Sequence, residues 1–286
     1  MNDLHDPSVV TRLARGVAPL LTGWGMPADS RVTLLAMSEN VTFRVDDART
    51  GRALALRVHR PGYHTRAEIL SELAWIEALR ADDVFRTVTP LPRLDDELIA
   101  SLDDTGGHRD VVAFDFVSGH EPRPGDALAE DFRTLGAISA RLHRHARQWT
   151  RPDGFVRKVW NTDTIVGATA HWGPWQDAIG LDPAGHAALA HAVRLLGERL
   201  HRFGTGSERF GLIHADLRLA NLLDNDGDLT VIDFDDCGFG WFLFDLAAAL
   251  SFIEEEPCVP ALIAAWLAGY RDVARCHRRT KRWFPR

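Results

Sequence analysis

The sequence predicts an α+β protein in two parts, a small antiparallel sheet followed by a mainly helical region. Apolar and polar residues alternate between residues 41 and 58, as in half-buried strands. After residue 125, apolar residues recur instead at the spacing of an amphipathic helix. A strand-like apolar stretch returns at residues 211–234, so we expect a small β patch within the helical part.

The composition is that of an ordinary soluble globular protein and limits the classes of partner. Of the 286 residues, 45% are hydrophobic and 26% are charged. The formal net charge is −7, which argues against a general nucleic-acid binder. The residues from Arg271 onward are locally basic, and we expect a solvated helix end there, with nucleic-acid or membrane-surface binding as the alternative.

Cysteine usage and the N-terminal residues favour a cytoplasmic protein. Cys237, Cys258 and Cys276 have no paired spacing, which favours a reducing compartment over a disulfide framework or a zinc ribbon. No apolar run reaches the roughly 18 residues that span a bilayer. The first ten residues also lack a basic segment followed by an apolar one, which a secretory signal needs. We therefore expect neither a membrane nor a nucleic-acid partner.

The first part starts with a helix and continues as a strand pair. Apolar positions at helical spacing predict an amphipathic helix within residues 1–25. Alternation predicts strands at 41–46 and 54–58, with a hairpin connection that contains Gly51. Arg57 is expected on the face of its strand opposite the leucines.

A capped helix follows these strands. Thr65 and Glu68 have the spacing of a capping box, and an apolar stripe at 69–79 continues the helix. Glu72 lies one turn beyond Glu68 and has no capping role. Two further strands are predicted, at residues 98–102 and 111–117.

A polar, proline-containing stretch at 121–125 separates the two parts. Asp182 and Pro183 are typical of a helix start, and Gly204 is typical of a helix end. The predicted helices of the second part are 128–142, 183–203, 245–253 and 260–273, and its predicted strands are 211–214, 222–223 and 229–234.

The β patch carries the strongest chemical signal. An apolar strand leads into His214 and Asp216, Asn221 follows five residues after Asp216, and a second apolar strand ends in Asp233. Amide and carboxylate oxygens of this kind are ligands that Mg²⁺ prefers. Asp216 is then left to accept a proton from a substrate hydroxyl. Phosphoryl transfer requires this arrangement, and the whole spacing is more specific than single Asp or Asn residues in turns.

At these residues the chain resembles the aminoglycoside phosphotransferase and choline kinase superfamily, and most closely its bacterial homoserine-kinase-like and stress-response-kinase-like members. The resemblance runs over roughly residues 30–270 and is strongest at 212–246. It implies a bilobal protein-kinase-like fold, with a nucleotide-binding lobe at 1–118 and a catalytic and substrate-binding lobe at 119–286. The implied activity is that of an ATP- and Mg²⁺-dependent phosphotransferase with a hydroxyl acceptor.

The resemblance also implies roles for single residues. Asp216 is the implied catalytic base, and Asn221 and Asp233 are the implied Mg²⁺ ligands. Arg218 stands where many protein kinases have a lysine that touches the transferred phosphate. Asp245 matches an aspartate that braces the catalytic loop, although a simple helix N-cap is equally compatible with its position. The histidine at position 214 matches one that packs under that loop, so we expect a structural role for it.

The first part departs from the protein-kinase pattern in two places. It has no G-x-G-x-x-G, and the matching loop contains Ser38, Asn40 and Thr42, which with the loop amides are the candidates to cover phosphates. The expected strand lysine is Arg57, which can bind two phosphate oxygens at once. Glu72 is the carboxylate best placed to pair with it, and a solvated surface pair is the alternative.

Adenine recognition is implied at the end of the first part. The resemblance places backbone groups of Asp115 and Val117 against the adenine, with Phe114 or Phe116 lining the pocket. Because main-chain groups do this, the side chains there carry little information.

The phosphate acceptor is expected to be a small molecule, and an amine-bearing one. Seven carboxylates and no Lys or Arg occur between Asp233 and Glu256, which favours an amino alcohol, an amino acid or an aminosugar. A solvated helix end at 254–256 is the alternative. Four tryptophans are candidates either for an acceptor pocket or for the core: Trp160, Trp172, Trp175 and Trp241.

Three other functions stay open at this point. The first is a protein Ser/Thr kinase. The second is a nucleotide-binding pseudokinase acting as a sensor or scaffold, which the missing glycine loop supports and the intact Asp216, Asn221 and Asp233 oppose. The third is a metal-dependent hydrolase that uses His214 and the aspartates. The sequence favours neither a monomer nor a homodimer.

Overall fold

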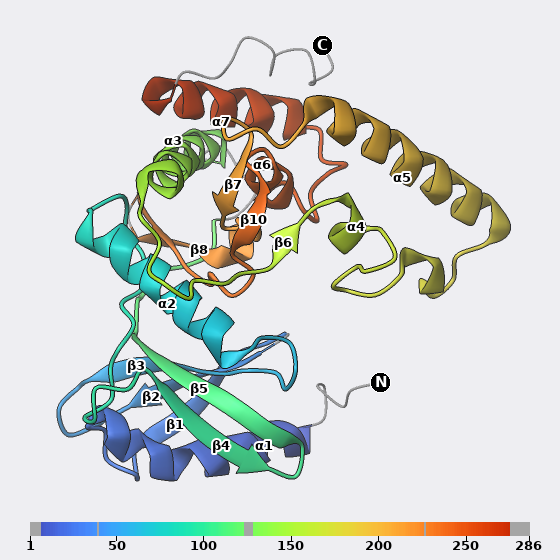
Figure 1. The fold of residues 1–286 in the computed structure, drawn as a ribbon. Helices are drawn as coiled ribbons and strands as arrows, with labels where there is room; N and C mark the ends of the chain where they lie inside the picture. The colour runs from blue at the N-terminus through green and yellow to red at the C-terminus, as the bar shows by residue number, and fades with distance from the viewer. Residues whose placement is uncertain (1–6, 39, 123–127, 226, 275–286) are drawn as a thin grey trace. The chain divides into compact units, whose positions relative to one another are not determined.

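A computed structural model describes residues 7–38, 40–122, 128–225 and 227–274 (Figure 1). The chain forms two compact units. The first unit takes in Met1–Glu121, Pro152–Val156 and Leu222–Ile232, and the other stretches make up the second unit. Segments distant in sequence therefore meet in the first unit. The division of function between residues 1–118 and 119–286 stays a prediction.

The first unit is built on a five-stranded antiparallel sheet in the order β1-β2-β3-β5-β4. The predicted hairpin is confirmed, since the Asp47 amide donates to the Arg52 carbonyl and Gly51 adopts a φ of 74°. The strands are β1 (Arg31–Met37), β2 (Val41–Asp46), β3 (Ala53–Val58), β4 (Ile99–Asp104) and β5 (Gly107–Asp115).

Two helical segments precede the sheet. Helix α1 (Pro7–Val17) continues into a 3₁₀ segment, Ala18–Trp24, where the sequence predicted one helix. The apolar stripe that predicted it is buried, and Leu13 and Leu21 join β3 residues such as Leu56 in one core cluster. The alternation of β3 thus directs its leucines into this core and leaves Arg57 for the opposite face.

Helix α2 (Arg66–Ala81) begins at the predicted capping box. The Glu68 amide donates to the Thr65 hydroxyl over 3.2 Å, and the Thr65 amide donates to the Glu68 carboxylate over 2.8 Å. Two of the donors that a helix start leaves unpaired are satisfied in this way.

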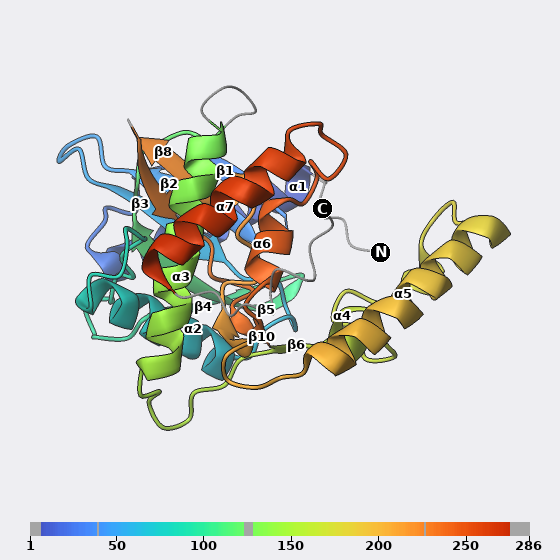
Figure 2. The same cartoon turned by 90° about the horizontal axis from the view of Figure 1, so that it is seen from above.

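Helices α3 (Leu128–Gln148) and α7 (Val259–Val273) form the helical core of the second unit, and Figure 2 shows α7 lying across α3. Glycines permit the crossing. A Cβ atom on Gly136 would lie 2.0 Å from the Trp266 carbonyl oxygen, and one on Gly269 would lie 1.8 Å from the Arg133 carbonyl oxygen. The two backbones therefore meet where no side chain fits.

A three-stranded sheet in the order β6-β10-β7 lies in the same unit: β6 (Val159–Trp160), β7 (Phe210–Ile213) and β10 (Gly238–Trp241). The sequence did not predict β10, because its Gly238 and Gly240 weaken a strand signal. Both glycines are needed for close packing. Added Cβ atoms would lie 2.5 Å from the Lys158 carbonyl oxygen and 2.5 Å from the Ile213 side chain, respectively.

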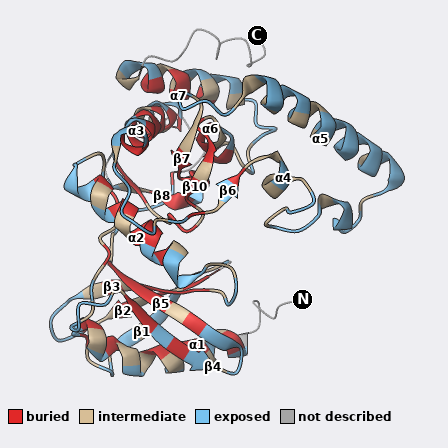
Figure 3. Ribbon diagram, in the orientation of Figure 1, coloured by how far each residue is buried: buried red, intermediate tan, exposed pale blue. Residues whose placement is uncertain are grey.

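The remaining α-helices described in this unit are α4 (Thr162–Ile165), α5 (Pro183–Phe203) and α6 (Phe244–Ala249), and two 3₁₀ segments lie at Trp175–Asp177 and Leu219–Asn221. The predicted start of α5 is confirmed, since the Asp182 carboxylate accepts from the Gly185 amide over 2.7 Å. No residue of α5 is buried (Figure 3).

Strands β8 (Leu222–Asn225) and β9 (Asp228–Val231) pair antiparallel after the Asp216 motif, where strands were predicted at 222–223 and 229–234. The prediction of a strand through residue 234 was wrong, because Asp233 adopts a φ of 61°, which ends the extended chain.

Within the described ranges, none of the helices has both the length and the apolar character needed to cross a bilayer. Most of the basic end, from residue 275 on, lies outside the described residues.

Asp104, the last residue of β4, makes the stability of the first unit depend on pH. Burial raises the pKa of Asp104, but hydrogen bonds from Arg12 (3.0 Å) and the Gly106 amide (2.8 Å) outweigh burial, and the pKa lies below its ordinary value of 3.8. A carboxylate whose pKa is lowered by folding stabilises the fold above its unfolded pKa, and this contribution is lost as the pH falls below 3.8 toward the folded pKa.

We therefore expect Arg12→Met to lower the melting temperature more at about pH 6 than at about pH 3. Thermal unfolding of variant and wild type across this range measures the difference. Arg133→Met, which removes an exposed pair with Asp272, is the control. An equal loss at both pH values would contradict the prediction.

Candidate active site

The predicted site residues fall into two sets, one in each unit. In the second unit, Asp216 lies on the loop that follows β7. Ala215 has a φ of 69°, an unusual value for a residue with a side chain, and it turns the chain out of the strand. His214 is fully buried beneath this loop. Its Nδ1 accepts from the Asp216 amide over 3.3 Å, and its ring centroid lies 4.4 Å from that of Phe234. These contacts support the structural role expected for His214.

Asp245 braces the same loop. Its buried carboxylate accepts from the Ala215 amide over 2.8 Å and from the His214 amide over 3.4 Å. His143 of α3 contacts the same carboxylate over 2.8 Å and also contacts the Tyr270 hydroxyl over 3.0 Å. Leu243 stands at the N-cap of α6 without a side-chain hydrogen bond, so the alternative of Asp245 as a simple N-cap was wrong.

The two oxygens of the Asp216 carboxylate lie in different surroundings. Its Oδ2 accepts from Arg218 Nε over 3.2 Å and from Asn221 Nδ2 over 2.5 Å. Across the described part of the chain, no donor contacts Oδ1. The side chain is 28% exposed. One oxygen is thus fixed, while the other is open to a hydroxyl group.

Asn221 and Asp233 are candidates to hold a cation. The Asn221 amide nitrogen donates both to the Asp216 carboxylate and to its carbonyl (2.9 Å). Because both partners are acceptors, the nitrogen must face Asp216, which leaves Oδ1 of Asn221 for another ligand. Strand β8 begins directly after Asn221 and β9 ends two residues before Asp233, so the pairing of Leu222 with Val231 brings Asn221 and Asp233 to the same end of the β8–β9 pair.

No group of three or more His, Cys, Asp and Glu side chains forms a metal cluster within the described ranges. An Asn amide oxygen together with one Asp carboxylate still fits Mg²⁺, because Mg²⁺ is commonly held by one or two protein ligands together with phosphate oxygens and water.

In the first unit, Arg57 of β3 pairs with Glu72 of α2, as predicted. Nη2 of Arg57 lies 2.6 and 2.8 Å from the two carboxylate oxygens. The side chains are 6% and 0% exposed, so the alternative of a solvated surface pair was wrong. The Phe114 ring centroid lies 5.2 Å from the guanidinium carbon.

The loop between β1 and β2 holds the candidate phosphate-covering residues. The Ser38 amide donates to the Asn40 carbonyl over 3.0 Å, and Asn40 Oδ1 accepts from the Arg60 amide over 3.0 Å. The Asn40 side chain therefore anchors this loop to the chain that follows β3. Residue 39 lies outside the described residues.

The candidate adenine-binding segment follows β5. The Asp115 amide donates to the Thr89 carbonyl over 3.0 Å, which leaves only its carbonyl as a candidate for adenine. Within the described ranges the Val117 amide makes no backbone hydrogen bond. Arg44 covers the Phe116 ring at 4.1 Å from its centroid.

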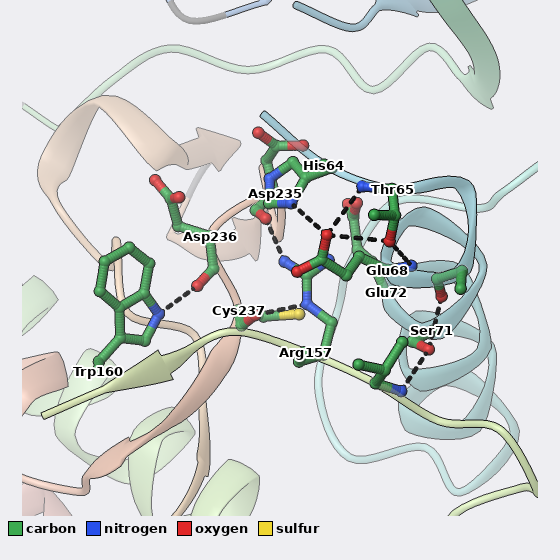
Figure 4. Close-up of polar contacts among 12 residues, drawn as sticks. His64, Thr65, Glu68, Ser71, Glu72, Arg157, Trp160, Asp235, Asp236 and Cys237 are labelled. Atoms are coloured by element: carbon green, nitrogen blue, oxygen red, sulfur yellow. Dashed lines mark hydrogen bonds and ion pairs between the residues drawn. The ribbon is translucent and has the colours of Figure 1, made fainter. Parts of the chain in front are cut away.

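Nothing in the sequence marks Arg157 as a functional residue. This residue is 5% exposed, and it donates to the backbone carbonyls of Asp235 and Cys237 (Figure 4). Its position between valines resembles a strand and carries no functional signal.

Of the four tryptophans, Trp160 and Trp241 are buried core residues. By contrast, Trp172 is 53% exposed.

The family is decided by comparison with known proteins. The model of the phosphotransferase enzyme family matches residues 32–281 of the chain. The chain belongs to the phosphotransferase enzyme family. The resemblance found in the sequence is confirmed, as is the α+β protein-kinase-like fold.

Individual relatives of this phosphotransferase span most of its length. An uncharacterized protein of Deinococcus radiodurans is 32% identical over 276 residues, which are 94% of this chain and 75% of that protein. The amicoumacin kinase of Bacillus subtilis is 22% identical over 268 residues, which are 91% of this chain and 74% of that kinase. A microcompartment-associated aminopropanol kinase of known structure is 42% identical in sequence, with a TM-score of 0.84. The match covers 92% of this chain and 81% of that kinase. The phosphotransferase is thus similar to an amicoumacin kinase and to an aminopropanol kinase.

Proposed function

We propose that this phosphotransferase is a cytoplasmic enzyme that moves the γ-phosphoryl group of ATP, with Mg²⁺, to a hydroxyl of a small amine-bearing molecule. The observation that carries the proposal is the Asp216 carboxylate. Its Oδ2 is held by Arg218 and Asn221, and its Oδ1 is open. In phosphoryl transfer the protein contributes mainly positioning and charge stabilisation, and such an oriented base supplies the positioning.

In the proposed reaction, Oδ1 of Asp216 accepts the hydrogen bond of the acceptor hydroxyl and then its proton. The contacts from Arg218 and Asn221 keep the carboxylate in one rotamer. Asp245 holds the loop through the two amides that precede Asp216. The loop therefore does not have to reorganise when the hydroxyl arrives.

The same proposal assigns the remaining predicted residues. Asn221 and Asp233 would hold Mg²⁺, which when bound neutralises phosphate charge. Arg57, oriented by Glu72, would contact phosphate oxygens. In the first unit, the loop with Ser38 and Asn40 and the backbone of Asp115 and Val117 would contact the nucleotide.

An amino alcohol is the acceptor that we favour. The solved relative at 42% identity is an aminopropanol kinase, which supports an acceptor that carries both a hydroxyl and an amine. Asp235 and Asp236 follow Asp233 after one intervening residue, Phe234, on the same loop, and carboxylates near a site favour a cationic ligand.

The test is Mg²⁺-dependent ADP release from ATP across a panel of acceptors. The panel contains aminopropanol, ethanolamine, choline, homoserine, an aminoglycoside, propanol as the alcohol without an amine, and a generic protein substrate. We expect stimulation by the small amino alcohols, none by propanol, and loss of activity with a chelator. Phosphorylated product, identified by mass spectrometry, would confirm the transfer.

Other outcomes would contradict the proposal in different ways. Phosphate found only on protein would make the enzyme a protein kinase. Nucleotide binding without transfer to any acceptor would favour a pseudokinase. Phosphoester cleavage without ATP would favour a hydrolase.

A further inference from the structure

The loop that follows Asp233 is held by side chains from a distant segment of the second unit. Asp233 itself adopts a φ of 61°, in the left-handed region that residues with side chains seldom occupy. Such a conformation persists where surrounding contacts hold it. The turn after it is closed by a hydrogen bond of 2.9 Å from the Cys237 amide to the Phe234 carbonyl.

Three successive carbonyls of this loop each accept from a side chain (Figure 4). Nε of Arg157 donates to the Cys237 carbonyl over 2.6 Å, and its Nη2 donates to the Asp235 carbonyl. Nε1 of Trp160 donates to the Asp236 carbonyl over 2.7 Å. Both side chains are buried, at 5% and 0% exposure.

An arginine side chain is suited to bind the carbonyls of Asp235 and Cys237 together. Its Nε–H and Nη2–H lie on one edge of a rigid, planar group, so one side chain fixes two acceptors at a set spacing. A lysine ammonium is a point charge on a flexible stem and cannot reproduce this edge.

The segment that carries both side chains is itself locked in place. Strand β6 pairs in parallel with β10, with Trp160 opposite Gly240. The Phe239 amide donates to the Lys158 carbonyl over 2.9 Å. Because β10 begins directly after Cys237, this strand pairing joins the segment that carries the donors to the loop that carries the carbonyls.

From these contacts we infer that Arg157 and Trp160 are positioning residues, which fix the Asp235–Cys237 loop and through it Asp233, whose carboxylate would hold the cation. The inference rests on the proposed function, in which Asp233 is a Mg²⁺ ligand. Residues that orient a metal ligand without touching the metal change metal affinity or activity by about 10–100-fold when they are replaced.

The experiment measures how much a metal strengthens nucleotide binding. Calorimetry gives the dissociation constant of AMP-PNP with Mn²⁺ and with EDTA, and the ratio of the two is the metal-dependent gain. We expect Arg157→Met to reduce this gain about tenfold or more, while the affinity in EDTA changes little. Arg157→Lys and Trp160→Phe should reduce the gain less, because each keeps part of the contacts. A merely structural role would lower the affinity equally with and without metal.

Arg209→Met is the matched control. Arg209 also donates from Nη1 to a backbone carbonyl of the second unit, that of Phe203, over 2.6 Å, but it contacts another loop. We expect this variant to keep the full metal-dependent gain. If Arg157→Met does not fold, as its melting curve would show, the two milder variants carry the test.

Asp233→Asn separates the two possible failures. If this variant loses the gain while the Arg157 and Trp160 variants keep it, the positioning role is overturned and the proposed function stands. If Asp233→Asn itself keeps the wild-type gain, the assignment of Asp233 as a cation ligand fails, and the positioning inference fails with it.

Discussion

Asp216→Asn is expected to lower kcat by about 10²–10⁴-fold while nucleotide binding is preserved. The amide oxygen of the substituted side chain would turn toward Arg218 and Asn221, since both are donors at Oδ2. Its NH₂ group would then replace Oδ1, so the open position would offer a donor where the acceptor hydroxyl needs a proton acceptor. The loss therefore has two causes, the missing base and the inverted hydrogen bond.

Steady-state ADP release with a saturating acceptor measures this loss, and calorimetry with AMP-PNP checks binding. Asp272→Asn is the matched control, because Asp272 makes an exposed pair with Arg133 (2.8 Å) in the same unit, and such pairs contribute little to stability. Turnover of Asp216→Asn within about threefold of the wild type would contradict the role of a base, which is expected to contribute far more.

The parts of the fold that the sequence predicted are those with a local cause. The capping box at Thr65 and Glu68 places the start of α2, and Asp182 places the start of α5. The spacing of Asp216, Asn221 and Asp233 is local in the same sense, since one loop and one hairpin join these residues. Short-range hydrogen bonds and periodicity are readable in a single sequence.

The parts that could not be predicted depend on neighbours distant in sequence. Gly238 and Gly240 weaken any strand signal for β10, yet the close packing of β6 and β7 requires them. Arg157 acts on carbonyls 78 and 80 residues further along the chain, and a backbone carbonyl leaves no trace in the sequence. For Asp245 the resemblance implied a brace of the catalytic loop, but an aspartate near a helix start is equally typical of a cap, so only the contacts in the fold decide between the two roles.

The pair of Arg57 and Glu72 illustrates a further limit of prediction from the sequence, which is that burial cannot be read from it. The residue types and the alternation of β3 suggested the contact, but burial decides its energetic weight. An exposed pair contributes about 0–1 kcal/mol, whereas breaking a buried pair from one side costs about 3–5 kcal/mol. The distinction depends on how α2 brings Glu72 against Arg57 on the sheet face opposite the leucine core.

Glu72→Ala is accordingly expected to destabilise the protein by about 3–5 kcal/mol, because it leaves the Arg57 guanidinium buried without its carboxylate. The double variant Arg57→Met/Glu72→Met should be more stable than Glu72→Ala, since it removes both buried charges and keeps apolar volume. Denaturant unfolding measures both free energies. Equal or greater destabilisation in the double variant would mean that the charges do not govern stability at this position.

Nucleotide affinity then separates the two roles of Arg57. If Arg57 serves only to neutralise Glu72, the double variant regains AMP-PNP affinity along with its stability. If Arg57 contacts phosphate oxygens, as proposed, stability returns and affinity does not. We expect the second result, because a methionine offers no donor to phosphate. Recovery of both stability and affinity would assign Arg57 to the fold and leave the phosphate contact to other residues of the first unit.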